Sequence, residues 1–432
     1  MFNSIKNIFS KVLNVMESAP IIDKSKLSKT ISTVGIVFPA NLSNEYLKKY
    51  KPFLLNQEKL PNLAKDFAKD NNKLLLLNPS YKLSDMANWP QELQELITKN
   101  NYETMDYTIK LGYDDMSAHE VLQQLLPNDV MIPGGFETVG TIAHLNLHKN
   151  QLPYKEIIGQ VLLDKNKTIK TVVNKTDKLN NVFRTPELEI IAGEKTLDTE
   201  LKEAGVTFKL NFEKVYWNSK LQAERDRLLK LFKPNEILCD MFCGIGPLSI
   251  RAAKMGMKVY ANDLNPECFE YLKINSKLNK VEHLVKPYNM DAREFVRHLI
   301  NKEDAFFNHV YMNLPVDALE FLDVFDGLMK EKKNKRWNKH NLPFIHVSAF
   351  DTGKTIEEVE NNFEERIQKV LKNFKKGSIS YIHQIKNITA EKKMFCVGFK
   401  LPEEVAFGGI IEDDKEETAE DFEKIEKKVK SE

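Results

Sequence analysis

The chain has 432 residues, of which 42% are hydrophobic and 29% are charged, and this length and composition predict two or three folded domains with a sizeable core. No stretch approaches the roughly 20 apolar residues that a membrane-spanning helix needs, so we expect no membrane partner. The net charge is +1, but twelve acidic and five basic residues lie in 401–432, which leaves +8 on the rest. That charge is compatible with a nucleic-acid partner, and it is equally compatible with an ordinary solvated surface.

The N-terminal region, residues 1–115, holds no catalytic motif. It is rich in Lys, Asn and Leu, and we expect it to be helical or irregular. Its first 20 residues contain no acidic residue before Glu17, and apolar residues recur at helical spacing from Phe2 to Leu13. That pattern fits either a mitochondrial transit peptide, although arginine is absent, or an ordinary amphipathic helix.

Residues 116–215 are predicted to form a small α/β domain. Ser117 and Glu120 have the spacing of a capping box at the start of a helix. Pro133-Gly-Gly135 marks a turn. After this turn we expect a strand, a helix and a second strand, over residues 136–147, 154–163 and 169–173.

Residues 216–402 alternate strands with helices, which is typical of a parallel, doubly wound sheet. No helix separates the last two strands, so we expect them to form an antiparallel hairpin. This outline predicts a Rossmann-like class I methyltransferase domain, and the acidic tail, 403–432, is expected to be disordered or a solvated helix. The expected strands cover residues 237–242, 258–263, 283–288, 308–313, 344–350, 379–385 and 394–399.

The glycine-containing segment Asp240-Met-Phe-Cys-Gly244-Ile-Gly246 lies between a strand and a helix, where glycines let a ligand approach the backbone. A dinucleotide-binding fingerprint needs a third glycine where Ser249 stands, so hydride chemistry is disfavoured. The four cysteines have neither zinc-binding nor redox spacing, and we expect no metal site.

Three polar residues follow later strands, at the edge of the sheet where ligands bind. Asp263 can accept hydrogen bonds from both ribose hydroxyls of a nucleoside, or it can help to cap the next helix. Asp291 can contact an adenine amino group, or it can serve only as a helix cap. Asn313, in Asn-Leu-Pro315, suits a target held by amide hydrogen bonds, although a structural asparagine is also possible there.

Six segments stand in one order along the chain: IPGGFETVGTIAHLNL (132–147), RTPELEIIAG (184–193), VYWN (215–218), ER (224–225), DMFCGIGP (240–247) and NLP (313–315). Together they resemble the archaeal and eukaryotic tRNA (guanine-37 N1)-methyltransferase family, and the resemblance covers about residues 117–401. It implies S-adenosylmethionine as cofactor, a tRNA gripped by its anticodon loop and body, a monomeric enzyme, and a modification that protects the reading frame. It also leaves the mitochondrial matrix, nucleus and cytoplasm open as locations.

The resemblance assigns roles to individual residues. It implies that Glu224 is the general base, that Arg184 steadies the target base, and that Asn313 lies at the transfer site. The chemistry agrees, because guanine N1 must lose its proton before it can attack a methyl group, and negative charge then builds on O6. Residues expected to bind the cofactor are Arg225, Asp240, Gly244, Gly246, Asp263, Leu264, Asp291, Ala292 and Asn313.

Two further features and two alternatives remain open. Tyr216 and Trp217 are either stacking partners for the target base or core residues, and the basic run 330–339 either contacts phosphates or is a solvated loop. The alternative functions are an aminocarboxypropyl transferase of wybutosine synthesis and a tRNA-binding protein without catalysis.

Overall fold

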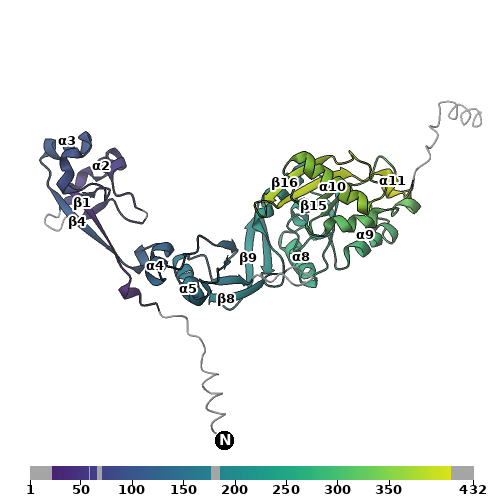
Figure 1. The fold of residues 1–432 in the computed structure, drawn as a ribbon, viewed down its shortest axis with the longest axis horizontal. Coiled ribbons are helices and arrows are strands. Elements are labelled where there is room, and N and C mark those ends of the chain that lie inside the picture. Colours follow the sequence, from purple (N-terminus) through teal and green to yellow (C-terminus); the bar gives the residue numbers. More distant parts are fainter. Residues whose placement is uncertain (1–21, 58, 66–70, 177–184, 334, 410–432) are drawn as a thin grey trace, which may run out of the picture. The chain divides into compact units, whose positions relative to one another are not determined.

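The computed structural model describes residues 22–57, 59–65, 71–176, 185–333 and 335–409 (Figure 1). The chain divides into two compact units. The first contains residues 1–136, 144–174 and 190–195, and the second contains residues 137–143, 175–189 and 196–432. Within the described ranges, no helix is both long enough and apolar enough to cross a membrane. The expected targeting segment and most of the acidic tail lie outside the described residues.

The N-terminal part of the first unit is an antiparallel sheet in the order β2-β3-β1-β4, so the expectation of helical or irregular structure there was wrong. Strand β1 carries the β-branched residues Val34 and Ile36, which favour strands because they are stiff at χ1 and pack well on a pleated surface. Both are buried in a core with Tyr46 and Trp89. The elements are β1 (Lys29–Pro39), α2 (Ser43–Lys49), β2 (Leu63–Lys65), β3 (Asn72–Leu76), α3 (Gln91–Asn100) and β4 (Thr104–Leu111).

The predicted capping box starts α4 (Ala118–Leu125). Glu120 N donates to Ser117 Oγ at 3.2 Å, and Ser117 N donates to Glu120 Oε2 at 2.9 Å. Gly140 has φ +56°, a conformation that favours glycine, and it divides the expected strand at 136–147 into two. A four-stranded sheet in the order β5-β6-β7-β8 accompanies helix α5. Its elements are β5 (Glu137–Val139), β6 (Ile142–Leu145), α5 (Lys155–Lys165), β7 (Thr171–Thr176) and β8 (Glu187–Gly193).

The second unit confirms the Rossmann-like prediction. Its sheet has the order β13-β12-β11-β14-β15-β17-β16, in which the first five strands are parallel and the last two are antiparallel. A hairpin of β9 (Asp198–Glu203) and β10 (Val206–Asn211) precedes it. The strands are β11 (Ile237–Asp240), β12 (Lys258–Asn262), β13 (Val285–Tyr288), β14 (His309–Met312), β15 (Phe344–Asp351), β16 (Tyr381–Asn387) and β17 (Lys393–Lys400).

Helices pack on this sheet and enclose its buried strands. The strands are apolar along their length, and polar residues follow them. Because the parallel strands all end at the same edge of the sheet, these polar residues gather at that edge. The helices are α6 (Gln222–Leu231), α7 (Ser249–Lys254), α8 (Pro266–Leu278), α9 (Ala292–Asn301), α10 (Ile356–Val370) and α11 (Glu403–Ala406).

Candidate active site

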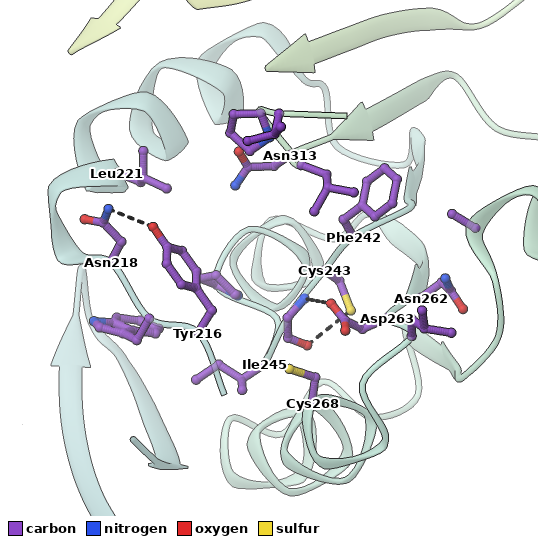
Figure 2. A pocket seen from close by; sticks show the side chains of 18 of the residues that line it. Tyr216, Asn218, Leu221, Phe242, Cys243, Ile245, Asn262, Asp263, Cys268 and Asn313 are labelled. Carbon is purple, nitrogen blue, oxygen red and sulfur yellow. Dashed lines mark hydrogen bonds between the residues drawn. The ribbon is translucent and has the colours of Figure 1, made fainter. Parts of the chain in front are cut away.

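A cavity of about 590 Å³ lies in the second unit, at the carboxyl ends of the parallel strands (Figure 2). Seven of the predicted residues line it, and four of these each follow a different strand: Gly244 after β11, Asp263 after β12, Asp291 after β13 and Asn313 after β14. The sheet topology thus brings together residues that lie up to 69 positions apart in the sequence, as the rule for open α/β sheets predicts.

Asp263 is the acidic centre of this cavity. Its Oδ2 accepts a hydrogen bond from Gly244 N at 2.8 Å, and its Oδ1 accepts one from Asn265 N at 2.9 Å. Burial raises the pKa of Asp263 above its ordinary value, while the two backbone donors oppose that shift. A carboxylate has about four lone-pair sites, so both oxygens can still accept hydrogen bonds from a ligand.

The two glycines of the loop differ in what they do. Gly244 has φ +56° and nothing within 4 Å of the position a Cβ would take, so it leaves open space at the cavity wall. Gly246 has φ +89°, and a Cβ there would lie 2.6 Å from Leu272 Cδ1 of α8. Gly246 therefore serves helix packing, and its contact with a cofactor stays a prediction.

Asp240 is fully buried behind the loop and is not among the residues that line the cavity. Ser249 Oγ donates to its Oδ2 at 2.6 Å, which ties the end of β11 to the start of α7. Burial raises the pKa of Asp240 to about 7. Its predicted contact with the cofactor would need an intermediary, and it stays a prediction.

Asp291 both caps a helix and faces the cavity. Its Oδ1 accepts from Arg293 N at 2.9 Å and from Glu294 N at 3.3 Å, and Ala292 beside it also lines the cavity. Leu264 lies on the rim with 48% of its surface exposed. These positions fit an adenine ring between apolar surfaces with an acceptor at its edge.

The structure adds Asn262, a wall residue that sequence reasoning missed. Its Nδ2 donates to Met241 O at 3.2 Å and to Met290 O at 3.0 Å, and its Oδ1 accepts from Met290 N at 3.1 Å. It thereby ties the end of β12 to the loops that follow β11 and β13. Its place as a polar residue at the end of an apolar strand was the available sequence signal, but the ligand-binding role at this strand end was assigned to Asp263 beside it.

The catalytic candidates occupy three different settings. Asn313 lines the cavity, and its Oδ1 is buried without a hydrogen-bond partner in the described part of the chain. Glu224, on α6, is buried against Arg227 and does not line the cavity. Arg184 lies outside the described residues, so its role stays a prediction.

Arg225 lines the cavity, but its guanidinium is already engaged. Nε and Nη2 donate to the two carboxylate oxygens of Glu203 at 2.9 and 2.5 Å, and the group lies over the Trp217 ring at 5.6 Å. The fixed guanidinium stiffens the cavity wall, and its predicted direct contact with a cofactor is untested.

The aromatic candidates differ in how much of each side chain is exposed. Tyr216 is half exposed at the cavity, and its hydroxyl accepts from Asn218 Nδ2 at 3.1 Å, so it is placed to meet a ligand (Figure 2). Trp217 also lines the cavity, but it is only 7% exposed and packs on Phe208, so it is chiefly a core residue. Trp337, the aromatic residue of the basic run, is 1% exposed and packs on Phe306 and Phe307.

Comparison with known proteins agrees with this geometry. Residues 199–371 match the TRM5/TYW2 methyltransferase domain, and residues 118–196 match the TYW2 N-terminal domain. A tRNA (guanine(37)-N(1))-methyltransferase of Paramecium tetraurelia is 44% identical over 421 residues, which cover 94% of each of the two chains.

Two solved structures show the same architecture. Trm5b from Pyrococcus abyssi superposes with a TM-score of 0.60 at 26% identity, over 85% of this chain and 99% of that one. TYW2 from Pyrococcus horikoshii, in complex with MeSAdo, superposes with a TM-score of 0.50 at 26% identity, over 66% of this chain and 97% of that one.

Proposed function

The chain belongs to the tRNA (guanine(37)-N(1))-methyltransferase family, and on that premise we propose how its cavity carries out the reaction. The protein is an S-adenosylmethionine-dependent tRNA methyltransferase, and it methylates N1 of guanosine 37. The observation that carries the assignment of the site is the convergence of Gly244, Asp263, Asp291 and Asn313 from four parallel strands on one cavity.

The proposed cofactor site runs from Asp263 to Asp291. The carboxylate of Asp263 accepts hydrogen bonds from the ribose hydroxyls, and the backbone of Gly244 leaves room for the ligand to approach. Asp291 and Ala292 face the adenine, with Leu264 covering it at the rim. When it is bound, S-adenosylmethionine supplies the activated methyl group, so the protein's own task is to position and deprotonate the target base.

At the base, Glu224 removes the N1 proton and Arg184 stabilises the charge that builds on O6. Asn313 holds the base through its amide. The unpartnered Asn313 Oδ1 at the cavity supports this part of the proposal, because a buried carbonyl oxygen without a partner costs free energy until a ligand donates to it. The exocyclic amino group of guanine is such a donor.

We also propose that the enzyme works as a monomer on the anticodon loop and body of tRNA. Target bases in anticodon loops can be unstacked and held in a pocket, and half-exposed Tyr216 offers a ring for that purpose. Location in the mitochondrial matrix, nucleus and cytoplasm is a further proposal, and the absence of acidic residues before Glu17 supports only its mitochondrial part. Fusing residues 1–20 to a fluorescent protein tests the mitochondrial part.

The assignment of the cavity is tested by competition. S-adenosylhomocysteine should protect the cavity rim from a cysteine-reactive probe placed at Leu264→Cys, while a probe at the remote exposed position Ile356→Cys should react equally with and without it. Equal protection of both positions, or of neither, would contradict binding in this cavity.

A further inference from the structure

Glu224 is almost completely shielded from solvent and is surrounded mainly by polar and charged side chains. Its side chain is 1% exposed, and Arg227, one turn along α6, holds both oxygens: Nε donates to Oε2 at 2.8 Å and Nη2 donates to Oε1 at 2.7 Å. From the neighbouring strands, His383 Nε2 on β16 lies 3.6 Å from Oε2, the Cys396 thiol on β17 hydrogen-bonds to the carboxylate, and Tyr311 on β14 faces it.

This enclosure poses a charge problem for a general base. A base must be ionised before it can accept a proton, yet an isolated carboxyl group taken out of water becomes neutral instead. A closely paired cation that also donates hydrogen bonds keeps such a buried group charged. Arg227 provides the two-point pair, because its guanidinium is planar and stays protonated at all ordinary pH values.

Arg227 is itself held in place by β16. Its Nη2 also donates to the Tyr381 hydroxyl at 3.3 Å, and the guanidinium lies over the Tyr381 ring at 4.8 Å. The hydroxyl in turn lies 2.7 Å from His346 Nδ1. His346 Nε2 lies 3.1 Å from His309 Nδ1, and His309 Nε2 lies 3.0 Å from Glu236 Oε2.

When both histidines are neutral, the hydrogen bonds that link Tyr381 to Glu236 allow only one assignment of donors and acceptors. Burial lowers the pKa of His309 and places the pKa of His346 well below its ordinary value, so both are neutral near pH 7. The Glu236 carboxylate only accepts, so His309 carries its proton on Nε2 and its Nδ1 accepts from His346 Nε2. His346 Nδ1 then accepts from Tyr381, whose oxygen accepts from Arg227.

We propose that Arg227 is a positioning residue of the methyl transfer: it keeps Glu224 charged and oriented, and the Tyr381–His346–His309–Glu236 chain fixes Arg227 for that purpose. The inference rests on the proposed role of Glu224 as the general base. In the transfer, the N1 proton of guanine would pass to the Glu224 carboxylate as N1 forms its bond to the methyl group, while the sulfur–methyl bond of S-adenosylmethionine breaks and S-adenosylhomocysteine leaves. Arg227 gives up no proton.

The test compares single-turnover methylation rates across a pH series for the full-length enzyme and its variants. In Arg227→Met the uncompensated carboxyl ionises only at higher pH, so the acidic limb of the profile should move up by about one pH unit or more. Arg227→Lys keeps the charge and loses the two-point geometry, so its limb should stay while its rate falls about tenfold or more. Lys230→Met removes an exposed cation from the same helix and should match the wild type.

A second variant tests the Tyr381–His346–His309–Glu236 chain of hydrogen bonds and leaves the Arg227 guanidinium in place. Tyr381→Phe keeps the ring under the guanidinium and removes the hydroxyl, and we expect a rate loss of about fivefold with unchanged cofactor affinity. If Arg227→Met does not fold, Arg227→Lys and Tyr381→Phe decide the question together. Wild-type rates in both would overturn the proposal, as would an unmoved acidic limb in a folded Arg227→Met enzyme.

Glu224→Gln separates the failure of this inference from the failure of the proposed function. A Glu224→Gln enzyme that methylates at the wild-type rate would remove the proposed base itself. A severely slowed Glu224→Gln enzyme beside a normal Arg227→Met profile would leave the base in place and refute only the role given to Arg227.

Discussion

Replacement of Asp263 should weaken cofactor binding by an amount that the structure lets us estimate. Both carboxylate oxygens are already anchored, by Gly244 N at 2.8 Å and by Asn265 N at 2.9 Å. The Cys268 thiol also donates to this carboxylate, but a thiol is a weak donor that a ribose hydroxyl can displace, so two ribose hydroxyls can still be accepted. Hydrogen bonds to a charged group contribute about 1.5–3 kcal/mol each. Losing two of them in Asp263→Ala costs about 3–6 kcal/mol, or roughly 10²–10⁴-fold in Kd.

Asp263→Asn refines the estimate. The amide keeps one acceptor oxygen, so we expect about half the loss, roughly 10–100-fold in Kd. Isothermal titration calorimetry with S-adenosylmethionine gives both values, and thermal melting without ligand shows whether the fold survives. Asp326→Ala, at an exposed carboxylate in the same unit, is the matched control and should bind like the wild type. An unchanged Kd in a folded Asp263→Ala protein would refute the ribose assignment.

Four further predictions test other parts of the account. Glu224→Gln should slow single-turnover transfer by about 10²–10⁴-fold with nearly unchanged cofactor affinity, and a large loss of affinity would contradict the general-base role. Burial raises the pKa of Asp240 to about 7. Its contribution to the free energy of unfolding is therefore complete below about pH 4 and is lost as pH rises through about 7. Between these values the free energy of unfolding should fall by up to about 1.4 kcal/mol per pH unit. In Asp240→Asn the free energy of unfolding, measured with denaturant, should depend less on pH between those values. An identical slope against pH in both proteins would contradict that prediction. Trp337→Ala should lower the free energy of unfolding by about 3–5 kcal/mol, whereas a surface aromatic residue would cost little. Neutralising the cations of the basic run should weaken tRNA binding and flatten its salt dependence in filter-binding assays, and unchanged binding would make the run a plain surface loop; those cations are Lys332, Lys333, Lys335 and Arg336.

Much of the catalytic fold could be predicted because its signals are local. Apolar strand runs alternate with helices from β11 to β15, and two adjacent strands without a helix indicated the antiparallel hairpin of β16 and β17. The N-terminal sheet was missed because its Lys- and Asn-rich composition outweighed the β-branched pattern of β1. Gly140 shows a finer limit, since one left-handed residue turned an expected strand into two.

The site residues also divide into those with a local sequence signal and those whose role depends on packing. Polar residues at strand ends, such as Asp263 and Asn313, are visible in sequence because the topology rule places them at one edge. The surroundings of Glu224 are not visible, because the Arg227–Tyr381 contact joins residues 154 positions apart and depends on how β16 packs against α6. The engagement of Arg225 by Glu203 is likewise a result of packing.

The central claim is most directly tested by identifying the product nucleoside. The purified enzyme is incubated with methyl-labelled S-adenosylmethionine and an unmodified tRNA that carries guanosine at position 37, and the tRNA is then digested and analysed by mass spectrometry. The account predicts labelled 1-methylguanosine, and no label when adenosine replaces that guanosine. A parallel reaction with a tRNA that carries the wybutosine precursor tests the alternative. No labelled methyl in the guanosine-37 tRNA, together with an aminocarboxypropyl group gained by the precursor tRNA, would contradict the account, as would tRNA that is bound but never modified.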